Sequence, residues 1–357
     1  MRSRIEATNR PNQPTGEIML SVQKSLTRVA LGCLLALASI ASLASGQDLS
    51  TDSIPEITQD QIEASIKKIT YKTAGNVELQ LHIFYPPNHQ VSDNRPAIVF
   101  FFGGGWVGGS PSQFYKQAWY LSQRGMVAAC AEYRIKSKHQ TTPKECVMDG
   151  KSAIRYVRQN ASKMGIDPGK IVAAGGSAGG HVAAATATVT QFNESTDDTS
   201  ISSIPCALVL FNPVLDNGPD GWGHAKVKDY WQDISPMHNV RSPATLSLFM
   251  LGDQDKLIPV ETAKKYQEVV KKNDGRCEVV IAKGQGHGYF NRGESFLVTL
   301  EATDKFLTSL GLIEGQPTVR KLLTPLVNKE LERGKKNQSK KKSKKDSNKK
   351  GGSGKKG

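Results

Sequence analysis

The sequence predicts an α/β fold built on a mainly parallel sheet, because short apolar runs typical of buried strands alternate with helix-forming stretches. The chain has 357 residues. That length accommodates one large domain of about 270 residues with tails at both ends. The predicted strands are residues 77–85, 97–102, 126–133, 171–174, 207–212, 245–251 and 277–281.

Two longer stretches have the spacing of amphipathic helices. Apolar residues recur every three or four positions within residues 144–164 and again within residues 295–310, so each set shares one helix face. The first set comprises Val147, Ile154, Val157, Ala161 and Met164, and the second comprises Phe296, Leu300, Leu307 and Leu310. Residues 213–243 interrupt the alternation with glycines, prolines and aromatic residues. A long insertion of this composition between two strands is a candidate lid or substrate wall.

The most informative motif is Gly-x-Ser-x-Gly at residues 175–179, with Ser177 at its centre. An apolar run leads into it, and a helix-forming stretch, residues 182–190, follows. This strand–turn–helix context is typical of a nucleophile elbow, whose sharp turn requires neighbours nearly without side chains. Gly175 and Gly179 meet that requirement. A glycine- and serine-rich loop without chemistry is the alternative, and three further features favour the elbow.

The first feature is the glycine triplet at residues 103–105, which follows a predicted strand and precedes Trp106. Backbone N–H groups at glycines are open to approach, so they can stabilise the oxyanion of an acyl-transfer reaction. The N–H group of Ala178, directly after the serine, would join them. A phosphate-binding loop is the competing interpretation. However, no Gly-Lys-Ser/Thr follows, and Trp106 stands where such a loop needs small or basic residues.

The second and third features are an acid and a base. Asp253 and Asp255 follow the sixth predicted strand, and either carboxylate could orient an imidazole. We favour Asp255 for this role and expect Asp253 to stabilise the loop. His287 lies beyond the acid in a glycine-flanked loop after the last predicted strand, whereas His181 falls on the helix after the serine. Ser177, Asp255 and His287 thus occur in the order nucleophile, acid, base.

In this order, the motifs resemble those of the α/β-hydrolase superfamily. Within it they are similar to the hormone-sensitive-lipase-like esterases and to bacterial secreted carbohydrate esterases of the acetyl-xylan or feruloyl type. The resemblance covers residues 66–310. It implies the α/β-hydrolase fold, with helices on both faces of the sheet, and assigns the oxyanion N–H groups to Gly104, Gly105 and Ala178. The family's oxyanion loop usually reads His-Gly-Gly-Gly-Trp. Phe102 replaces the histidine here, which removes a side chain that braces the loop.

Motifs and resemblance together predict a serine hydrolase that cleaves short-chain carboxylic esters, including acyl groups on carbohydrate, through an acyl-enzyme. No metal or organic cofactor is expected. A serine peptidase of the same fold is one alternative, and a non-catalytic surface-binding protein on a hydrolase scaffold is another. No domain of the kind that gates such peptidases is evident, and a complete set of Ser, Asp and His favours catalysis. Four aromatic residues are the predicted pocket walls, namely Phe102, Trp106, Trp222 and Trp231.

The net charge of +14 is concentrated in the C-terminal tail. Residues 333–357 contain eleven Lys and one Arg against one Asp, whereas residues 47–332, the predicted catalytic domain, are neutral overall. The neutral domain gives no indication of a nucleic-acid partner. Because the tail contains no apolar residue, we predict that it is disordered and contacts anionic polysaccharide or lipid surfaces. A solvated tail without a partner is the alternative.

The first 46 residues have the pattern of a signal peptide. Lys24 and Arg28 precede an apolar run at residues 29–38, and small residues follow up to Gly46. We predict cleavage near Gly46 and a secreted or periplasmic protein. The polar stretch before Met19 indicates that translation can start at that methionine. An uncleaved anchor is the alternative, although the apolar run is short for a membrane span.

Four cysteines remain after the predicted signal peptide, namely Cys130, Cys146, Cys206 and Cys277. Their spacing matches no metal-binding motif. Three of them lie on or beside predicted strands, where buried free thiols are ordinary. An even number of cysteines in an exported protein permits disulfides without specifying a pairing.

Overall fold

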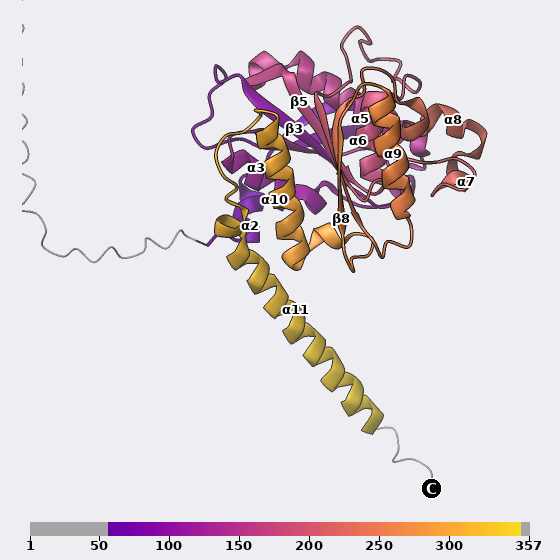
Figure 1. Cartoon of the computed structure of the whole chain (residues 1–357). Helices are drawn as coiled ribbons and strands as arrows, with labels where there is room; N and C mark the ends of the chain where they lie inside the picture. The colour runs from indigo at the N-terminus through magenta and orange to yellow at the C-terminus, as the bar shows by residue number, and fades with distance from the viewer. Residues whose placement is uncertain (1–55, 351–357) are drawn as a thin grey trace, which may run out of the picture. The chain divides into compact units, whose positions relative to one another are not determined.

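The computed structural model describes residues 56–350, in which an eight-stranded sheet is covered by helices on both faces (Figure 1). The strands are β1 (Lys67–Ala74), β2 (Val77–Phe84), β3 (Arg95–Phe101), β4 (Val127–Ala131), β5 (Ile166–Gly176), β6 (Ala207–Phe211), β7 (Leu246–Gly252) and β8 (Cys277–Ala282). Their spatial order is β1-β2-β4-β3-β5-β6-β7-β8. The pairings of β1 with β2 and of β2 with β4 are antiparallel, and the other five are parallel. The predicted mainly parallel sheet is confirmed. The predicted signal peptide lies outside the described residues.

The longer helices form two layers around the sheet. They are α3 (Tyr115–Gln123), α5 (Pro143–Gln159), α6 (Ala178–Thr188), α9 (Val260–Lys272) and α10 (Gly293–Ser309). Helices α5, α6 and α9 cover one face of the sheet, and α3 and α10 cover the other (Figure 1). Each layer has its own buried apolar cluster. Two shorter helices are α2 (Gln59–Ala64) and α4 (Lys136–His139), and short 3-10 turns are η1 (Pro111–Phe114), η2 (Ala161–Met164) and η5 (Tyr289–Asn291).

All seven predicted strands are present, and the apolar faces predicted for two helices are buried except for a half-buried Leu310. Strand β1, at the edge of the sheet, is not among the predicted strands. Three of its eight residues are lysines, and only two of the eight are buried. A charged strand of this kind is a common way to protect a sheet edge from further pairing. Its pattern therefore lacks the apolar run by which the inner strands are recognised.

The insertion at residues 213–243 folds into short helices that pack onto the body of the protein. These are α7 (His224–Val227), η3 (Lys228–Tyr230), α8 (Trp231–Ile234) and η4 (Pro236–Asn239). Val227 and Ile234 are fully buried in a small cluster with Val147 of α5 and Ala185 of α6. The segment is thus anchored by its own apolar residues on the layer formed by α5 and α6.

The last helix corrects the predicted boundary of the disordered tail. Helix α11 spans Val319–Lys350. Its first part, up to Val327, is apolar and buried against the layer of α3 and α10. Just beyond it, Glu330 forms an ion pair with Lys116 at 2.8 Å. The structure continues this helix through residues 333–350, so the prediction of disorder is wrong for that segment. Lysine, glutamine and glutamate are good helix formers, and a packed first part supplies the nucleus that propagation needs. Residues 351–357 lie outside the described part of the chain.

All four cysteines of the described chain are free. Cys130, Cys146 and Cys277 are buried, and burial raises the pKa of each thiol. The exposed fraction of Cys206 is larger, and burial again raises its pKa, to about 11. Between residues 56 and 350, no helix combines the length and the apolar character that a membrane crossing requires.

Candidate active site

Ser177 occupies the tip of a sharp turn between β5 and α6. Its backbone has φ 54° and ψ −120°, a conformation that residues with a side chain rarely adopt. The turn is possible because two glycines allow a very close approach of the chain. A Cβ at Gly179 would lie 2.1 Å from the carbonyl oxygen of Phe101, and a Cβ at Gly175 would lie 2.3 Å from that of Gly179. Both motif glycines are therefore required by sterics.

The structure brings Ser177, His287 and Asp255 into one hydrogen-bonded chain. The distance from Ser177 Oγ to His287 Nε2 is 3.0 Å, and that from His287 Nδ1 to Asp255 Oδ2 is 2.7 Å. The Asp255 carboxylate is fully buried, and the imidazole is 23% exposed. Burial alone would raise the pKa of Asp255. Hydrogen bonds from His287 and from the N–H groups of Leu257 and Ile258 outweigh that effect and lower it, so the carboxylate stays ionised.

Asp253 has a different place in the same loop. Its Oδ1 accepts a hydrogen bond from the N–H of Gly284 at 2.6 Å, which ties the turn after β7 to the loop that carries His287. It is Asp255 rather than Asp253 whose carboxylate reaches the imidazole. The two aspartates therefore have different partners, Asp255 the imidazole of His287 and Asp253 the backbone of Gly284.

The glycine loop after β3 lies directly against the serine. A Cβ at Gly103 would be 3.3 Å from Ser177 Cβ. Among the described residues, the N–H groups of Gly104, Gly105 and Ala178 donate to no protein acceptor. Ala178 is the first residue of α6, so its N–H also lies at the positive end of the helix dipole. Unpaired donors in the loop beside Ser177 and at the start of α6 can stabilise a negatively charged oxygen.

Together these groups can perform acyl transfer. The imidazole can accept the serine proton while the carboxylate holds its other nitrogen, and the free N–H groups can bind the oxyanion that results. No set of three or more His, Cys, Asp or Glu side chains is arranged to hold a metal ion within residues 56–350.

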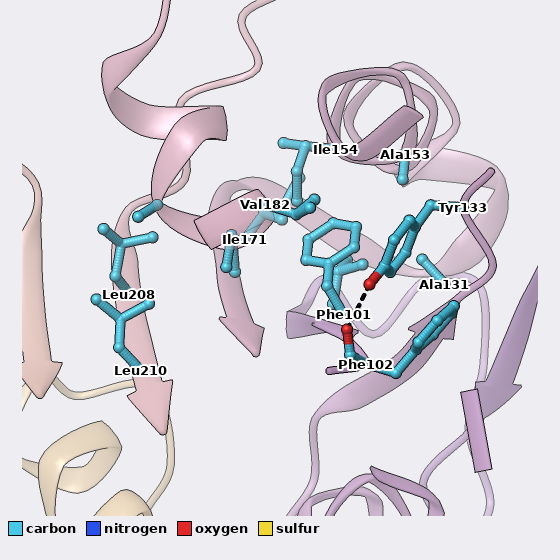
Figure 2. Packing of buried hydrophobic residues seen from close by; sticks show 14 of the residues in the cluster. Phe101, Phe102, Ala131, Tyr133, Ala153, Ile154, Ile171, Val182, Leu208 and Leu210 are labelled. Atoms are coloured by element: carbon cyan, nitrogen blue, oxygen red, sulfur yellow. Dashed lines mark hydrogen bonds between the residues drawn. The ribbon is translucent and has the colours of Figure 1, made fainter. Parts of the chain in front are cut away.

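Contacts that the sequence analysis did not identify hold the glycine loop. The hydroxyl of Tyr133 donates to the carbonyl of Phe102 at 2.6 Å, and the two rings stack with centroids 4.2 Å apart (Figure 2). Gln113 Oε1 accepts from the N–H of Gly103 at 2.6 Å, and its Nε2 donates to Asn291 Oδ1 at 3.0 Å. These bonds brace the loop in which Phe102 replaces the family's histidine. No local pattern marks Gln113 for this role.

Asn212, at the end of β6, is a second residue that the sequence analysis missed. It is fully buried, and its Oδ1 accepts from the N–H of Gly288 at 3.3 Å. Its Nδ2 lies 3.5 Å from Nδ1 and 3.4 Å from Nε2 of His287. Nearly equal distances to both ring nitrogens place the amide against the face of the ring rather than in its plane. Asn212 therefore restricts the orientation of the imidazole.

Of the four aromatic residues predicted as pocket walls, two lie beside the glycine loop. Trp106, itself part of the loop, is 1% exposed, and its ring centroid is 5.3 Å from that of Trp222. A Cβ at Gly105 would be 3.4 Å from the Trp222 ring. These two side chains form a wall next to Gly105.

The other two aromatic residues make packing contacts. Phe102 is buried beneath the loop, where its ring stacks on Tyr133. Trp231 lies on α8, where its ring packs against His224 and His238. Both residues serve packing, because apolar contacts within the core and within the insertion engage their rings.

His181 lies one turn after Ser177 on α6 and is fully buried. Its Nε2 donates to the carbonyl of Ile234 at 3.1 Å, and its ring packs edge-on against Trp106. Burial lowers its pKa to about 4, despite hydrogen bonds that act in the opposite direction. A neutral imidazole therefore links the insertion to the loop that carries Trp106.

Comparison with solved structures reveals a close structural relative. The apo form of esterase 2 from Thermogutta terrifontis is 41% identical in sequence and superposes with a TM-score of 0.69. The match covers 71% of this chain and 98% of that chain. Other structures of the same esterase have propionate or butyrate bound.

Similarity to curated proteins points in the same direction. Esterase LipC from Mycobacterium tuberculosis is 29% identical over 218 residues, which are 54% of this chain and 53% of LipC. A probable isoprenylcysteine alpha-carbonyl methylesterase from Arabidopsis thaliana, ICMEL2, is 27% identical over 237 residues, or 60% of this chain and 55% of that protein. The chain thus spans about half the length of the curated relatives it matches. The BD-FAE family matches residues 81–210.

The neutral state of His181 makes the stability of the fold depend on pH. Its folded pKa of about 4 lies below the ordinary value of 6.5, so between these values the unfolded chain binds a proton that the folded chain does not. The stabilisation is complete above pH 6.5 and is lost as the pH falls towards 4. Urea unfolding measures the free energy of unfolding at pH 6.5 and at pH 5. Over this interval that free energy should fall by about 1.5 kcal/mol more in the parent protein than in His181→Gln.

His238→Gln provides the matched control, because it removes an exposed imidazole from the insertion and leaves His181 in place. An equal loss of stability in the parent and in His181→Gln would contradict the assignment of a neutral buried imidazole.

Proposed function

The chain belongs to the esterases of the α/β-hydrolase family, and from that premise we propose that it is a serine carboxylesterase acting on short-chain acyl esters. The proposal rests on the hydrogen bonds that connect Ser177 Oγ to His287 at 3.0 Å and His287 to Asp255 at 2.7 Å. Three N–H groups without an acceptor lie in the neighbouring glycine loop and at the start of α6. A hydroxyl with an oriented base and preorganised donors is the arrangement that ester cleavage requires.

In the acylation step, Ser177 Oγ attacks the ester carbonyl carbon while His287 Nε2 accepts its proton. Asp255 keeps the imidazole in the tautomer that carries hydrogen on Nδ1 and stabilises the imidazolium that forms. The N–H groups of Gly104, Gly105 and Ala178 bind the oxyanion of the tetrahedral intermediate. His287 then gives its proton to the leaving alcohol, and the acyl group remains on Ser177.

Deacylation repeats the same sequence with water. His287 Nε2 accepts a proton from a water molecule, whose oxygen attacks the acyl carbon. The oxyanion again forms against the three N–H groups. Collapse of the intermediate returns the proton to Ser177 and releases the carboxylic acid. The buried Asp255 remains ionised throughout, because its hydrogen bonds lower its pKa.

Short acyl groups are the substrates that the surroundings of the serine favour. Trp106 and Trp222 form an aromatic wall beside Gly105, against which a short acyl chain can pack. The binding of propionate and of butyrate by the related Thermogutta esterase supports the same size range. We extend the proposal to acyl groups carried on carbohydrate, on the basis of the motifs shared with secreted carbohydrate esterases.

Export and surface contact complete the proposal. Residues 1–46 carry the signal-peptide pattern, which supports a secreted or periplasmic location. The twelve positive charges of residues 333–357 support contact with anionic polysaccharide or lipid. The apolar part of α11 that packs on the body ends at Val327, before this segment begins.

The first test measures hydrolysis of 4-nitrophenyl esters with acyl chains from two to ten carbons. We expect acetyl to butyryl esters to give the highest kcat/KM, and Ser177→Ala to lower kcat by a factor on the order of 10⁴ or more, since triad residues act as a unit. Circular dichroism of the variant should match that of the parent. Undiminished hydrolysis by Ser177→Ala, or a preference for long-chain triglycerides, would contradict the proposal.

The two neighbouring aspartates form a matched pair of variants. Asp255→Asn removes the charge that supports the imidazolium and should lower kcat by a factor of roughly 10³–10⁴. Asp253→Asn retains an oxygen that can accept from Gly284, so its kcat should fall by less than about tenfold. Steady-state kinetics on 4-nitrophenyl butyrate measure both values. A larger loss for Asp253→Asn would mean that the acid is assigned incorrectly.

Truncation after Glu332 tests the boundary of the folded enzyme. The shortened chain keeps the packed part of α11 and the ion pair between Lys116 and Glu330, so its kcat on 4-nitrophenyl acetate should be unchanged. It should elute from a cation-exchange matrix at a lower salt concentration than the full chain, because most of the net charge is gone. Loss of activity on truncation would show that the lysine-rich end belongs to the enzyme core.

A further inference from the structure

A cavity of about 290 Å³ opens beside the oxyanion loop, on the side where Trp106 forms the wall. It is bounded by Gly105 and Trp106 of that loop, by Lys136 of α4, by residues 140–143 at the N-terminal end of α5, and by Lys226 of α7. Because Gly105 belongs both to this cavity and to the donors around Ser177, a group bound here can be part of the same molecule as the ester.

The cavity has two cationic side chains and no acidic ones. Lys136 and Lys226 line it, and neither ammonium group pairs with a carboxylate among the side chains described between residues 56 and 350. Lys226 Nζ instead donates to the carbonyl of Gly105 at 2.9 Å and lies 5.6 and 5.1 Å from the ring centres of Trp106 and Trp222. Partial burial and, secondarily, the charge of Lys136 lower the pKa of Lys226. The two positive charges therefore repel one another across a space without a counterion.

The acidic residue in the first turn of the adjoining helix α5 already has hydrogen-bond partners. Glu145 accepts hydrogen bonds from the N–H and the hydroxyl of Thr142 at the N-terminus of α5. Two residues that line the cavity, by contrast, each have a buried polar atom without a partner, namely Nε1 of Trp106 and Oγ1 of Thr141. The wall carries excess positive charge, which is the chemistry that recognises an anionic oxygen.

From these contacts we infer that the cavity is a subsite for a carboxylate carried by the ester substrate. The inference rests on the proposed esterase function and narrows its substrate class to esters that bear a free acid at a short distance from the scissile bond. Half-esters of dicarboxylic acids and acyl esters of hydroxy or uronic acids have this chemistry. The carboxylate would supply the counterion that Lys136 and Lys226 lack, and the indole rings would cover the apolar part of the same group.

The experiment compares matched pairs of charged and neutral esters by pH-stat titration. For a carboxylate on the acyl side, the pair is mono(4-nitrophenyl) glutarate and 4-nitrophenyl pentanoate. For a carboxylate on the alcohol side, the pair is 4-acetoxybenzoate and phenyl acetate. The readout is the ratio of kcat/KM for the charged ester to that for its neutral partner, in the full-length protein and in its variants.

Charge reversal at Lys136 is the decisive variant. Lys136 is exposed and makes no side-chain hydrogen bond to the oxyanion loop, so Lys136→Glu should fold normally. The variant should lower the ratio of kcat/KM for the charged ester to that for the neutral ester at least about tenfold in one of the two pairs, mainly by raising KM for the charged ester. In the parent protein, a higher salt concentration should reduce the same ratio. Lys138→Glu is the matched control, because Lys138 lies on the same short helix but does not line the cavity. This control should keep the ratio of the parent.

The outcomes separate this inference from the function on which it rests. A ratio that Lys136→Glu leaves unchanged in both pairs would overturn the inference while the esterase function stands. An equal loss for charged and neutral esters would also overturn it, because the lysine would then act on the oxyanion and not on a substrate carboxylate. Absence of turnover for all four esters would overturn the proposed function and the inference together.

Discussion

The backbone of Ser177 is the constraint on which the rest of the site depends. Its positive φ holds the hydroxyl at the tip of a turn that joins β5 directly to α6. The turn exists only because the chain on either side approaches within distances that exclude a side chain at Gly175 and Gly179. The same approach sets the first turn of α6 against the carbonyl groups of Phe101 and Phe102. Strain at one residue thereby fixes the position of the glycine loop relative to the nucleophile.

The parallel half of the sheet delivers the remaining groups to one edge. Strands β3, β5, β6, β7 and β8 run in the same direction, so their carboxyl ends lie side by side. Each contributes the segment that follows it, which carries in turn the glycine loop, Ser177, Asn212, Asp255 and His287. Crevices at the carboxyl ends of parallel strands are the usual place for ligands in open α/β sheets. Register between neighbouring strands therefore sets the distances between groups that lie far apart in the sequence.

A buried ion-pair cluster holds the segment that supports the glycine loop. Asp149 of α5 is fully buried and pairs with Lys72 at 2.6 Å and with Arg134 at 2.7 Å, and Glu194 pairs with both cations. The N–H of Arg134 also donates to Asp149 at 2.8 Å. Buried pairs of this kind add little net stability, because desolvation offsets the attraction. Here the ion pairs hold the backbone that follows β4. Further along this segment, the N–H groups of Lys136 and Ser137 donate to the carbonyl groups of Trp106 and Val107.

The sequence by itself determined what local patterns encode. Apolar runs marked the inner strands, and the elbow motif marked Ser177. The order of motifs marked His287. The sequence did not determine Gln113 or Lys226, because their partners lie 10 or more residues away in other elements and no spacing rule connects them. The helix through residues 333–350 was not predicted, because a lysine-rich composition without apolar residues is typical of disordered segments. The packed first part of α11 supplies a nucleus from which the helix continues into these residues. The sequence favoured Asp255 over Asp253, but only the tertiary structure decided which carboxylate meets the imidazole and which aromatic rings lie beside the glycine loop, since both depend on how strands and crossovers bring distant loops together.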